Sequence, residues 1–263
     1  MTRVAVVQVH PRLGVVKENI ARCLSLAERE NADVFVFPEL VTTGYNFSSP
    51  DQLLAVAESA ENGPSLEAFS QFAAAKGCHV CYGFVEKSQE GFYNSSTLVG
   101  PSGRIGTYRK THLYDREKIF FQPGNSGFVV HSLPFGSVGM MICFDWFFPE
   151  AMRTLALRGA QLILHPSNLV LPHCPDGLRT RCLENRVFAA SADRVGTEEG
   201  GEGPLTFIGR SEIVSPLGQV LSRMDECQEG VTVVDCDLAS ANSKAINTRN
   251  DLFKDRRPMF YEQ

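Results

Sequence analysis

Apolar runs of strand length alternate with helical patterns along this chain, and that alternation restricts its fold more than any other feature. Residues 4–9 form a short apolar run, residues 16–30 place apolar side chains at helical spacing, and residues 34–37 form a second run. This order predicts a β-α-β unit. Because no Gly/Ser/Pro-rich linker interrupts the pattern, we expect one α/β domain whose buried sheets are covered by helices.

The rest of the chain continues the alternation. We expect helices at 51–60, 65–76, 148–158, 177–188 and 238–246, and strands at 78–85, 93–99, 104–109, 127–131, 136–143, 160–166, 190–195, 206–214, 219–223 and 230–236. A long polar loop covers residues 110–126. Ligands of α/β proteins gather beyond the carboxyl ends of the strands, so polar residues at those ends are the candidates for function.

The charge and hydropathy of the chain exclude several classes of partner. The net charge is −5, and no basic run is longer than two residues, so we expect neither nucleic acid nor an anionic membrane as a partner. No apolar run approaches the ~20 residues that cross a bilayer. The first apolar stretch is too short for a secretion signal, so we expect a cytoplasmic protein whose eight cysteines are reduced.

The pair Cys78 and Cys81 has the spacing of a metal or redox motif. It lies in "KGCHVCYGFV", which resembles a strand, and neither a second CxxC nor a following helix completes such a site. We therefore expect no metal and no cofactor.

Three predicted strands end in residues that can carry chemistry. "DVFVFPEL" places Glu39 after one strand, "GRIGTYRK" places Lys110 after another, and "GMMICFDW" places Cys143 after a third. A carboxylate, an amine and a thiol could therefore converge. The alternatives are that Glu39 and Lys110 form a surface salt bridge and that Cys143 is a small core residue.

Cys143 falls between the end of an apolar strand and a segment with helix-opening residues, "DWFFPE". Backbone N–H groups at the start of a helix stabilise negative charge. We therefore expect the turn to lower the pKa of the Cys143 thiol and to make it a nucleophile.

The segments "FPEL", "YRKTHLYD" with the following "EKIFFQPG", and "ICFDWFFPE" resemble the three signature blocks of the nitrilase superfamily, the thiol-dependent carbon–nitrogen hydrolases. The resemblance extends through "ALRGAQLILHPSNL", "RCLENRVFAASADRVG" and "FIGRSEIVSPLGQVL", and it is nearest to the nitrilase-like amidohydrolases with CFDWFFPE and HPSNLVLP. It implies a single-domain, four-layer α-β-β-α sandwich over residues 1–263, with 247–263 as a C-terminal arm.

The resemblance also implies the roles of the candidate residues. Cys143 is then the nucleophile, Glu39 the general base, and Lys110 the stabiliser of the tetrahedral intermediate, together with the backbone N–H of Phe144. Glu117 matches a second glutamate of this superfamily and would orient the lysine or the substrate amide. The alternative for Glu117 is a solvated loop carboxylate.

Aromatic residues follow Cys143 and predict an apolar pocket wall of Phe144, Trp146 and Phe147, although aromatics near a buried strand end often only pack the core. Tyr45 and Asn168 follow other strand ends and are candidate polar contacts. Superfamily members that recognise a substrate carboxylate usually place an arginine near this segment, and this sequence has none there. The resemblance therefore implies a small, neutral, linear amide that is hydrolysed to ammonia and a carboxylic acid.

Other functions stay open at this point. The Cys-Phe-Asp sequence favours amides over nitriles, but a nitrilase acting on small aliphatic nitriles or an N-carbamoyl amine hydrolase is an alternative. A papain-like hydrolase would need His165 or His173 as its base and would leave Glu39 and Lys110 without roles. A non-catalytic binding protein on the same scaffold is less favoured, because Glu39, Lys110 and Cys143 are all present.

The tail "NTRNDLFKDRRPMFYEQ" mixes aromatic and basic residues without a strand or helix period. Aromatic residues at a frayed end would be left in water. The superfamily resemblance implies that helical layers pair across a two-fold axis and that C-terminal arms are exchanged, so we expect a homodimer or a higher homo-oligomer.

Overall fold

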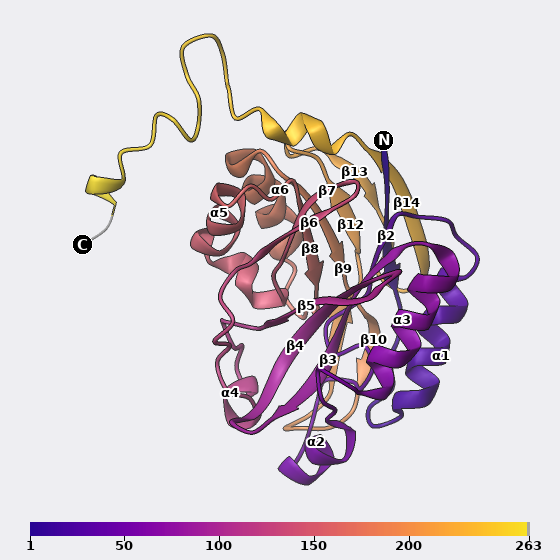
Figure 1. Ribbon diagram of the computed structural model, residues 1–263. Coiled ribbons are helices and arrows are strands. Elements are labelled where there is room, and N and C mark those ends of the chain that lie inside the picture. The colour runs from indigo at the N-terminus through magenta and orange to yellow at the C-terminus, as the bar shows by residue number, and fades with distance from the viewer. Residues whose placement is uncertain (262–263) are drawn as a thin grey trace.

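Two six-stranded sheets pack face to face in the computed structural model, which describes residues 1–261 (Figure 1). The first sheet has the order β14-β1-β2-β3-β4-β5, and β1, β2 and β3 are parallel at its centre. Its strands are β1 (Thr2–Gln8), β2 (Val34–Val36), β3 (His79–Ser88), β4 (Gly91–Gly100), β5 (Gly103–Arg109) and β14 (Gly230–Cys236).

The second sheet has the order β13-β12-β9-β8-β7-β6, again with a parallel centre formed by β7, β8 and β9. Its strands are β6 (Val130–Leu133), β7 (Gly136–Met140), β8 (Leu162–Pro166), β9 (Phe188–Ala192), β12 (Glu212–Val214) and β13 (Val220–Arg223). A separate two-stranded ribbon pairs β10 (Val195–Glu198) with β11 (Leu205–Ile208).

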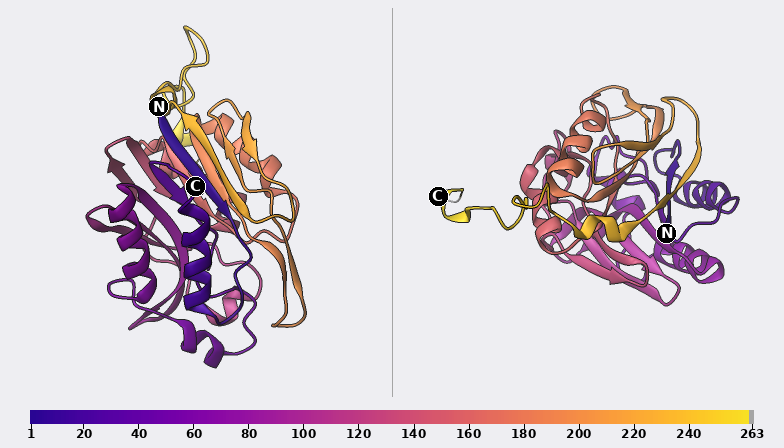
Figure 2. Two further views of the ribbon diagram at one scale, coloured as in Figure 1. Left: turned by 90° about the vertical axis from the view of Figure 1, so that its right-hand side faces the viewer. Right: turned by 90° about the horizontal axis from the view of Figure 1, so that it is seen from above.

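Helices cover the outer face of each sheet, which makes four layers (Figures 1 and 2). Helices α1 (Val16–Ala27) and α3 (Pro64–Lys76) pack on the first sheet, and α5 (Pro149–Leu157) and α6 (Cys174–Asn185) pack on the second. The shorter helices are α2 (Pro50–Val56), α4 (Glu117–Phe120) and the 3-10 helices η1 (Cys143–Phe147), η2 (Leu238–Asn242) and η3 (Pro258–Phe260). The predicted α-β-β-α sandwich is confirmed.

The burial of both faces of the central strands explains this arrangement. The central strands are apolar on both faces: Val4 and Val36 point into the core between the sheets, whereas Ala5 and Phe35 point toward α1 and α3. Buried parallel strands of this kind read as continuous apolar runs.

Several predicted elements differ from the structure in their bounds: the helix predicted at 51–60 is α2, and the strands predicted at 127–131 and 190–195 are β6 and β9. Three further predictions differ in other ways. Residues 206–214 are two strands, β11 and β12, because Gly209 and Arg210 have φ of 61° and 60° and break the extended backbone. The helix predicted at 177–188 ends at Asn185, where Arg186 is left-handed. The segment 238–246 contains only the short η2.

The C-terminal segment leads away from the four layers (Figure 2). Its start is anchored, because the ring of Phe253 packs on the α5 and α6 layer and lies under the charged groups of Arg153 and Lys244. Its end is exposed: Met259, Phe260 and Tyr261 retain 71%, 73% and 61% of their accessible surface. Residues 262 and 263 of the predicted arm lie outside the described residues. Among residues 1–261, no helix combines the length and hydropathy of a membrane span.

Candidate active site

The three predicted strand ends meet at one end of the sandwich. Glu39 and Lys110 follow β2 and β5 of the first sheet, and Cys143 follows β7 of the second, so the group lies where the two sheets face each other. All three side chains are buried. The alternative that Glu39 and Lys110 form a salt bridge on the surface is therefore wrong, because the pair is buried.

Lys110 stands between two carboxylates. Its Nζ donates to Glu39 Oε1 at 2.6 Å and to Glu117 Oε1 at 2.7 Å. Asn94, from the middle of β4, also donates to Glu39 Oε1 at 2.7 Å. The other oxygen of Glu39, Oε2, is buried and has no hydrogen-bond partner among residues 1–261.

The backbone around Glu39 requires a glycine on the neighbouring strand. A Cβ at Gly83 of β3 would lie 2.4 Å from the Leu40 nitrogen and 2.7 Å from the Glu39 Cα. Leu40 itself has φ of 45°, in the left-handed region that ordinary residues avoid. The loop after β2 therefore packs closely against β3, and this contact fixes the position of the Glu39 backbone.

Lys110 is directed inward while its neighbour Arg109 points away. The Lys110 N–H donates to the Asn94 carbonyl, and the Lys110 carbonyl accepts from Gly124 N–H, both at 2.8 Å. Arg109 pairs instead with Glu86 at 2.6 Å. Alternate residues of a strand point to opposite faces, which separates the two basic side chains.

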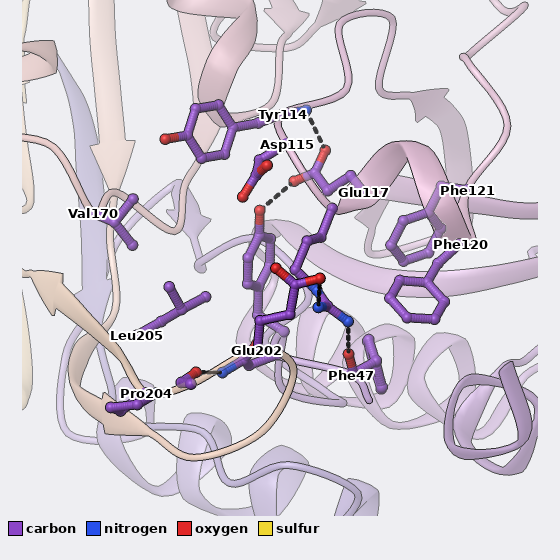
Figure 3. Close-up of a pocket in the computed structure, with 14 residues that line it drawn as sticks. Phe47, Tyr114, Asp115, Glu117, Phe120, Phe121, Val170, Glu202, Pro204 and Leu205 are labelled. Carbon is purple, nitrogen blue, oxygen red and sulfur yellow. Dashed lines mark hydrogen bonds and ion pairs between the residues drawn. The ribbon is translucent and has the colours of Figure 1, made fainter. Parts of the chain in front are cut away.

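Glu117, the first residue of α4, is held by three donors. Its Oε1 accepts from Lys110 at 2.7 Å and from the Tyr45 hydroxyl at 2.8 Å. Its Oε2 accepts from Tyr114 N–H at 3.0 Å (Figure 3). Burial raises the pKa of Glu117 to about 7, against the opposing effect of Lys110. Glu117 is therefore no solvated loop carboxylate.

The charges of this group are coupled. Burial by itself lowers the pKa of Lys110, but the Glu117 and Glu39 carboxylates outweigh it, and the net pKa is raised. Lys110 is therefore an ammonium ion at neutral pH. One ammonium ion between two carboxylates leaves one negative charge uncompensated, so the group of Glu39, Lys110 and Glu117 can bind one additional proton.

Cys143 begins η1, is separated from the end of β7 by two residues, and has φ of +40°. The predicted turn from strand to helix is confirmed, but the expected low thiol pKa is wrong. Burial raises the pKa of Cys143 well above its usual value, Glu39 adds to this increase, and Lys110 opposes it. A five-residue 3-10 helix provides too little dipole to offset the burial, so the thiol stays protonated at rest.

The positive φ of Cys143 is supported by Asp145. The Asp145 carboxylate accepts from Ile142 N–H and the Tyr108 hydroxyl, both at 2.8 Å, and from His112 N–H at 3.1 Å. Two of these donors flank Lys110 in the sequence. Asp145 therefore joins the turn of Cys143 to the strand end of Lys110, a role that the sequence analysis did not identify.

The two histidines considered as bases do not bond the Cys143 sulfur. Among residues 1–261, Sγ makes one hydrogen bond, to the Asn168 carbonyl at 3.8 Å. His165 Nε2 lies 3.0 Å from the Cys143 carbonyl oxygen, and burial lowers the pKa of His165 to about 4. His165 is thus a neutral, buried residue. Because the Cys143 carbonyl oxygen can only accept a hydrogen bond, His165 Nε2 must be the donor.

Two cavities meet beside these residues and share Tyr114 and Val170. The smaller, of about 50 Å³, has an almost wholly apolar wall around the thiol and is lined by Tyr114, Cys143, Phe144, Trp146, Phe147, Asn168, Leu169, Val170, Leu171 and His173. The larger, of about 210 Å³, is bordered by Glu117 and Tyr45, and the Arg116–Glu202 ion pair is also part of its lining. Figure 3 shows Glu117 and Glu202 in this lining.

The residues expected to bind substrate divide between these cavities. Phe144, Trp146, Phe147 and Asn168 line the smaller one, and both side-chain polar atoms of Asn168 are buried without a partner among residues 1–261. Tyr45 lines the larger cavity. Phe147 is half exposed, so it is no core residue.

The CxxC pair lies in a different part of the molecule. Cys78 and Cys81 are buried beside and within β3, and Cys81 Sγ lies 3.2 Å from the Ser96 hydroxyl. In residues 1–261, no group of three or more His, Cys, Asp or Glu side chains has the arrangement of a metal site.

Comparisons with known proteins all point to the same family. A family model described as carbon-nitrogen hydrolase matches residues 3–245. A protein named nitrilase from Pyrococcus abyssi is 45% identical over 264 residues, which is 99% of each chain. The N-carbamoylputrescine amidase of Arabidopsis thaliana is 30% identical, with 92% of this chain and 87% of that protein aligned.

Solved structures of the amidase from Nesterenkonia sp. AN1 share the fold. A glutamate-to-glutamine mutant, which shows the result of Michael addition of acrylamide at the active site cysteine, matches with a TM-score of 0.84 and 28% identity, over 99% of this chain and 98% of that one. A cysteine-to-alanine mutant in complex with butyramide matches with a TM-score of 0.80 and 26% identity, over 99% and 95% of the chains.

Proposed function

The chain belongs to the carbon–nitrogen hydrolase family of the nitrilase superfamily, and on this premise we propose that it hydrolyses small, neutral, linear amides to ammonia and a carboxylic acid. The observation that carries the proposal is the state of Glu39. One oxygen is held by Lys110 and Asn94, and the other is buried and unpartnered among the described residues. A carboxylate held in this way has a free oxygen that can accept a proton.

The proposed reaction begins with the Cys143 thiol. Glu39 removes its proton, and the sulfur forms a bond to the amide carbon while the carbonyl π electrons move to the oxygen. Lys110 donates two of its three N–H groups to Glu39 and Glu117, which leaves one for this oxyanion. The backbone N–H of Phe144 is the second proposed donor. Removal of one such donor typically costs about 2.7–4 kcal/mol of barrier.

The second half of the reaction returns the enzyme to its resting state. The C–N bond breaks as Glu39 gives its proton to the leaving amine, so that ammonia departs and a thioester remains. Glu39 then takes a proton from water, the hydroxide adds to the thioester carbon, and the C–S bond breaks. The sulfur recovers its proton and the carboxylic acid is released. Glu117 orients Lys110 throughout, as the third group of a triad does.

The small cavity supports the choice of substrate. Its volume of about 50 Å³ and its apolar walls suit a short acyl chain. The carboxamide of Asn168, unpartnered among residues 1–261, offers an NH₂ donor group and a carbonyl acceptor to a substrate amide. Phe144, Trp146 and Phe147 would form the apolar wall. Tyr45 contacts Glu117, so its proposed role is to border the site and not to bind the acyl chain.

Nitriles are the second candidate substrates, since the relative from Pyrococcus abyssi is named nitrilase. N-carbamoyl amines are the third, on the name of the Arabidopsis thaliana relative. The test is an ammonia-release assay across short amides, carbamoyl compounds and aliphatic nitriles, repeated with Cys143→Ala. Release from amides alone, and only by the wild type, is expected. Release from nitriles or carbamoyl compounds alone would replace the substrate class, and no release from any would refute the proposed hydrolysis.

We also propose a homodimer or a larger homo-oligomer in which residues 247–263 form an arm that contacts a second copy. The exposed Met259, Phe260 and Tyr261 support this, because a terminal segment rarely leaves such side chains in water. A cytoplasmic location is proposed on the eight cysteines, all of which are free thiols.

A further inference from the structure

A buried ion pair lies on the β10 ribbon, outside the group of Glu39, Lys110 and Cys143. Arg194 Nη1 lies 2.9 Å from Glu198 Oε1, and both side chains are almost fully buried. Removal of a charged pair from water is costly unless the pair's own attraction and additional hydrogen bonds compensate. The partners of each residue therefore show what the pair holds in place.

The second oxygen of Glu198 holds the loop that follows β2. Glu198 Oε2 accepts from the backbone N–H groups of Tyr45 at 2.8 Å and Asn46 at 2.6 Å. The Asn46 side chain returns a hydrogen bond to the Glu198 carbonyl at 3.1 Å. Gly44 has φ of +80°, and a Cβ there would lie 2.7 Å from Glu198 Oε1. The carboxylate thus fits closely against this turn.

Arg194 holds the same region from the other side. Its Nη2 donates to the Pro11 carbonyl at 2.8 Å, and its guanidinium lies 4.1 Å from the centre of the Phe207 ring. That ring meets the Tyr45 ring edge to face, with the centres 6.0 Å apart. The backbone and the ring of Tyr45 are therefore fixed by residues of β10 and β11 or adjacent to them.

We infer that Glu198 and Arg194 are positioning residues for the reaction, because they fix Tyr45 so that its hydroxyl donates to Glu117 Oε1 at 2.8 Å. Neither touches the reacting groups. The inference rests on the proposed function, in which Glu117 orients Lys110. The charged or titratable groups that interact with Glu117 include Lys110, Glu39, Tyr45, Tyr114 and Cys143.

A double-mutant cycle tests this inference, with Tyr45→Phe, Glu198→Gln and the double variant. Tyr45→Phe removes one donor to a charged carboxylate, and we expect kcat/KM to fall about tenfold or more. Loss of that donor favours the protonated form of Glu117, so the acid limb of the pH profile should move to higher pH. Glu198→Gln should move the limb in the same direction.

The double variant decides between positioning and general stability. If Glu198 acts through Tyr45, the double variant is no slower than Tyr45→Phe alone. Independent losses that multiply, or a Glu198→Gln enzyme with an unmoved acid limb, would overturn the inference. If Glu198→Gln does not fold, Arg194→Lys takes its place in the cycle. A lysine keeps a positive charge beside Glu198 but lacks the second guanidinium nitrogen that donates to the Pro11 carbonyl.

Glu212→Gln is the matched control, since Glu212 is a buried carboxylate paired with Arg223 at 2.6 Å between β12 and β13. It should lower the melting temperature without moving the acid limb. The cycle is repeated by measuring iodoacetamide alkylation of Cys143 against pH, which needs no turnover. A wild type that hydrolyses nothing would refute the proposed function, whereas additive effects in the alkylation cycle would refute the positioning role.

Discussion

Lys110 Nζ lies 2.6 Å from Glu39 Oε1, and neither side chain is exposed to solvent. The same ammonium lies 2.7 Å from Glu117. A buried charge is tolerated only when it is paired, so each member of this group determines the protonation of the others.

Substitution of Lys110 should destabilise the fold far more than substitution of Glu39. Lys110→Met leaves two buried carboxylates without a counter-charge, for which about 3–5 kcal/mol is typical. Glu39→Gln keeps the shape and the hydrogen bonds and leaves Lys110 paired with Glu117, so the loss should be much smaller. Urea unfolding of both variants measures the difference; equal losses would contradict the paired arrangement.

Glu39→Gln should nevertheless abolish most activity, with a loss of kcat in the range of about 10²- to 10⁴-fold for a general base. It should also slow the reaction of Cys143 with iodoacetamide, because the raised pKa of this thiol makes it depend on a base. Peptide mass spectrometry reports each cysteine separately. The exposed Cys227 is the internal control and should react equally in both proteins.

The pH profile should show an acid limb at about pH 7. The pKa of Glu117 is raised by burial to about 7, so this carboxyl is protonated as the pH falls below that value. Its ion pair with Lys110 is then lost, and kcat/KM should decrease. Glu117→Gln should be slow at every pH and should lack this limb. A limb that persists unchanged in that variant would assign it to another group.

Gly83→Ala should reduce activity through the backbone of Glu39. A new Cβ would lie 2.4 Å from the Leu40 nitrogen, and backbone atoms on both sides cannot move apart cheaply. We expect a loss of about 1–3 kcal/mol of stability, as for other overpacked sites, and a lower kcat. Gly230→Ala is the control, because its Cβ would meet only the flexible end of Met224 at 3.2 Å.

Deletion of residues 249–263 should weaken self-association. The exposed side chains of Met259, Phe260 and Tyr261 are the proposed contacts with a second copy. Sedimentation of the full-length chain at micromolar concentration should give a dimer or larger species, and the truncated chain should shift toward monomer. A full-length chain that sediments as a monomer would show the proposed assembly to be wrong.

The sequence alone predicted the α/β class and the locations of Glu39, Lys110 and Cys143 at strand ends. Those features are local: apolar runs and helical spacing show which segments are buried, and a polar residue that directly follows such a run stands at the edge of a sheet. The same dependence on local patterns explains why some predicted strand and helix bounds were wrong. Breaks such as Gly209 and Arg210 lie in an otherwise strand-like segment, and their left-handed backbone has no period to detect.

Only the tertiary structure decided which residues surround Glu39, Lys110 and Cys143. Asn94 reaches Glu39 from the middle of β4 because of strand pairing, and Asp145 joins the turn of Cys143 to the strand end of Lys110 in the other sheet. The low thiol pKa expected from the helix start was wrong for the same reason, since Cys143 belongs to the core formed by both sheets and its sulfur is buried there. The period of the apolar residues shows whether a side chain is buried. Which residues it contacts, and whether it is protonated, depend on how the two sheets pack against each other, and their strands come from distant parts of the sequence.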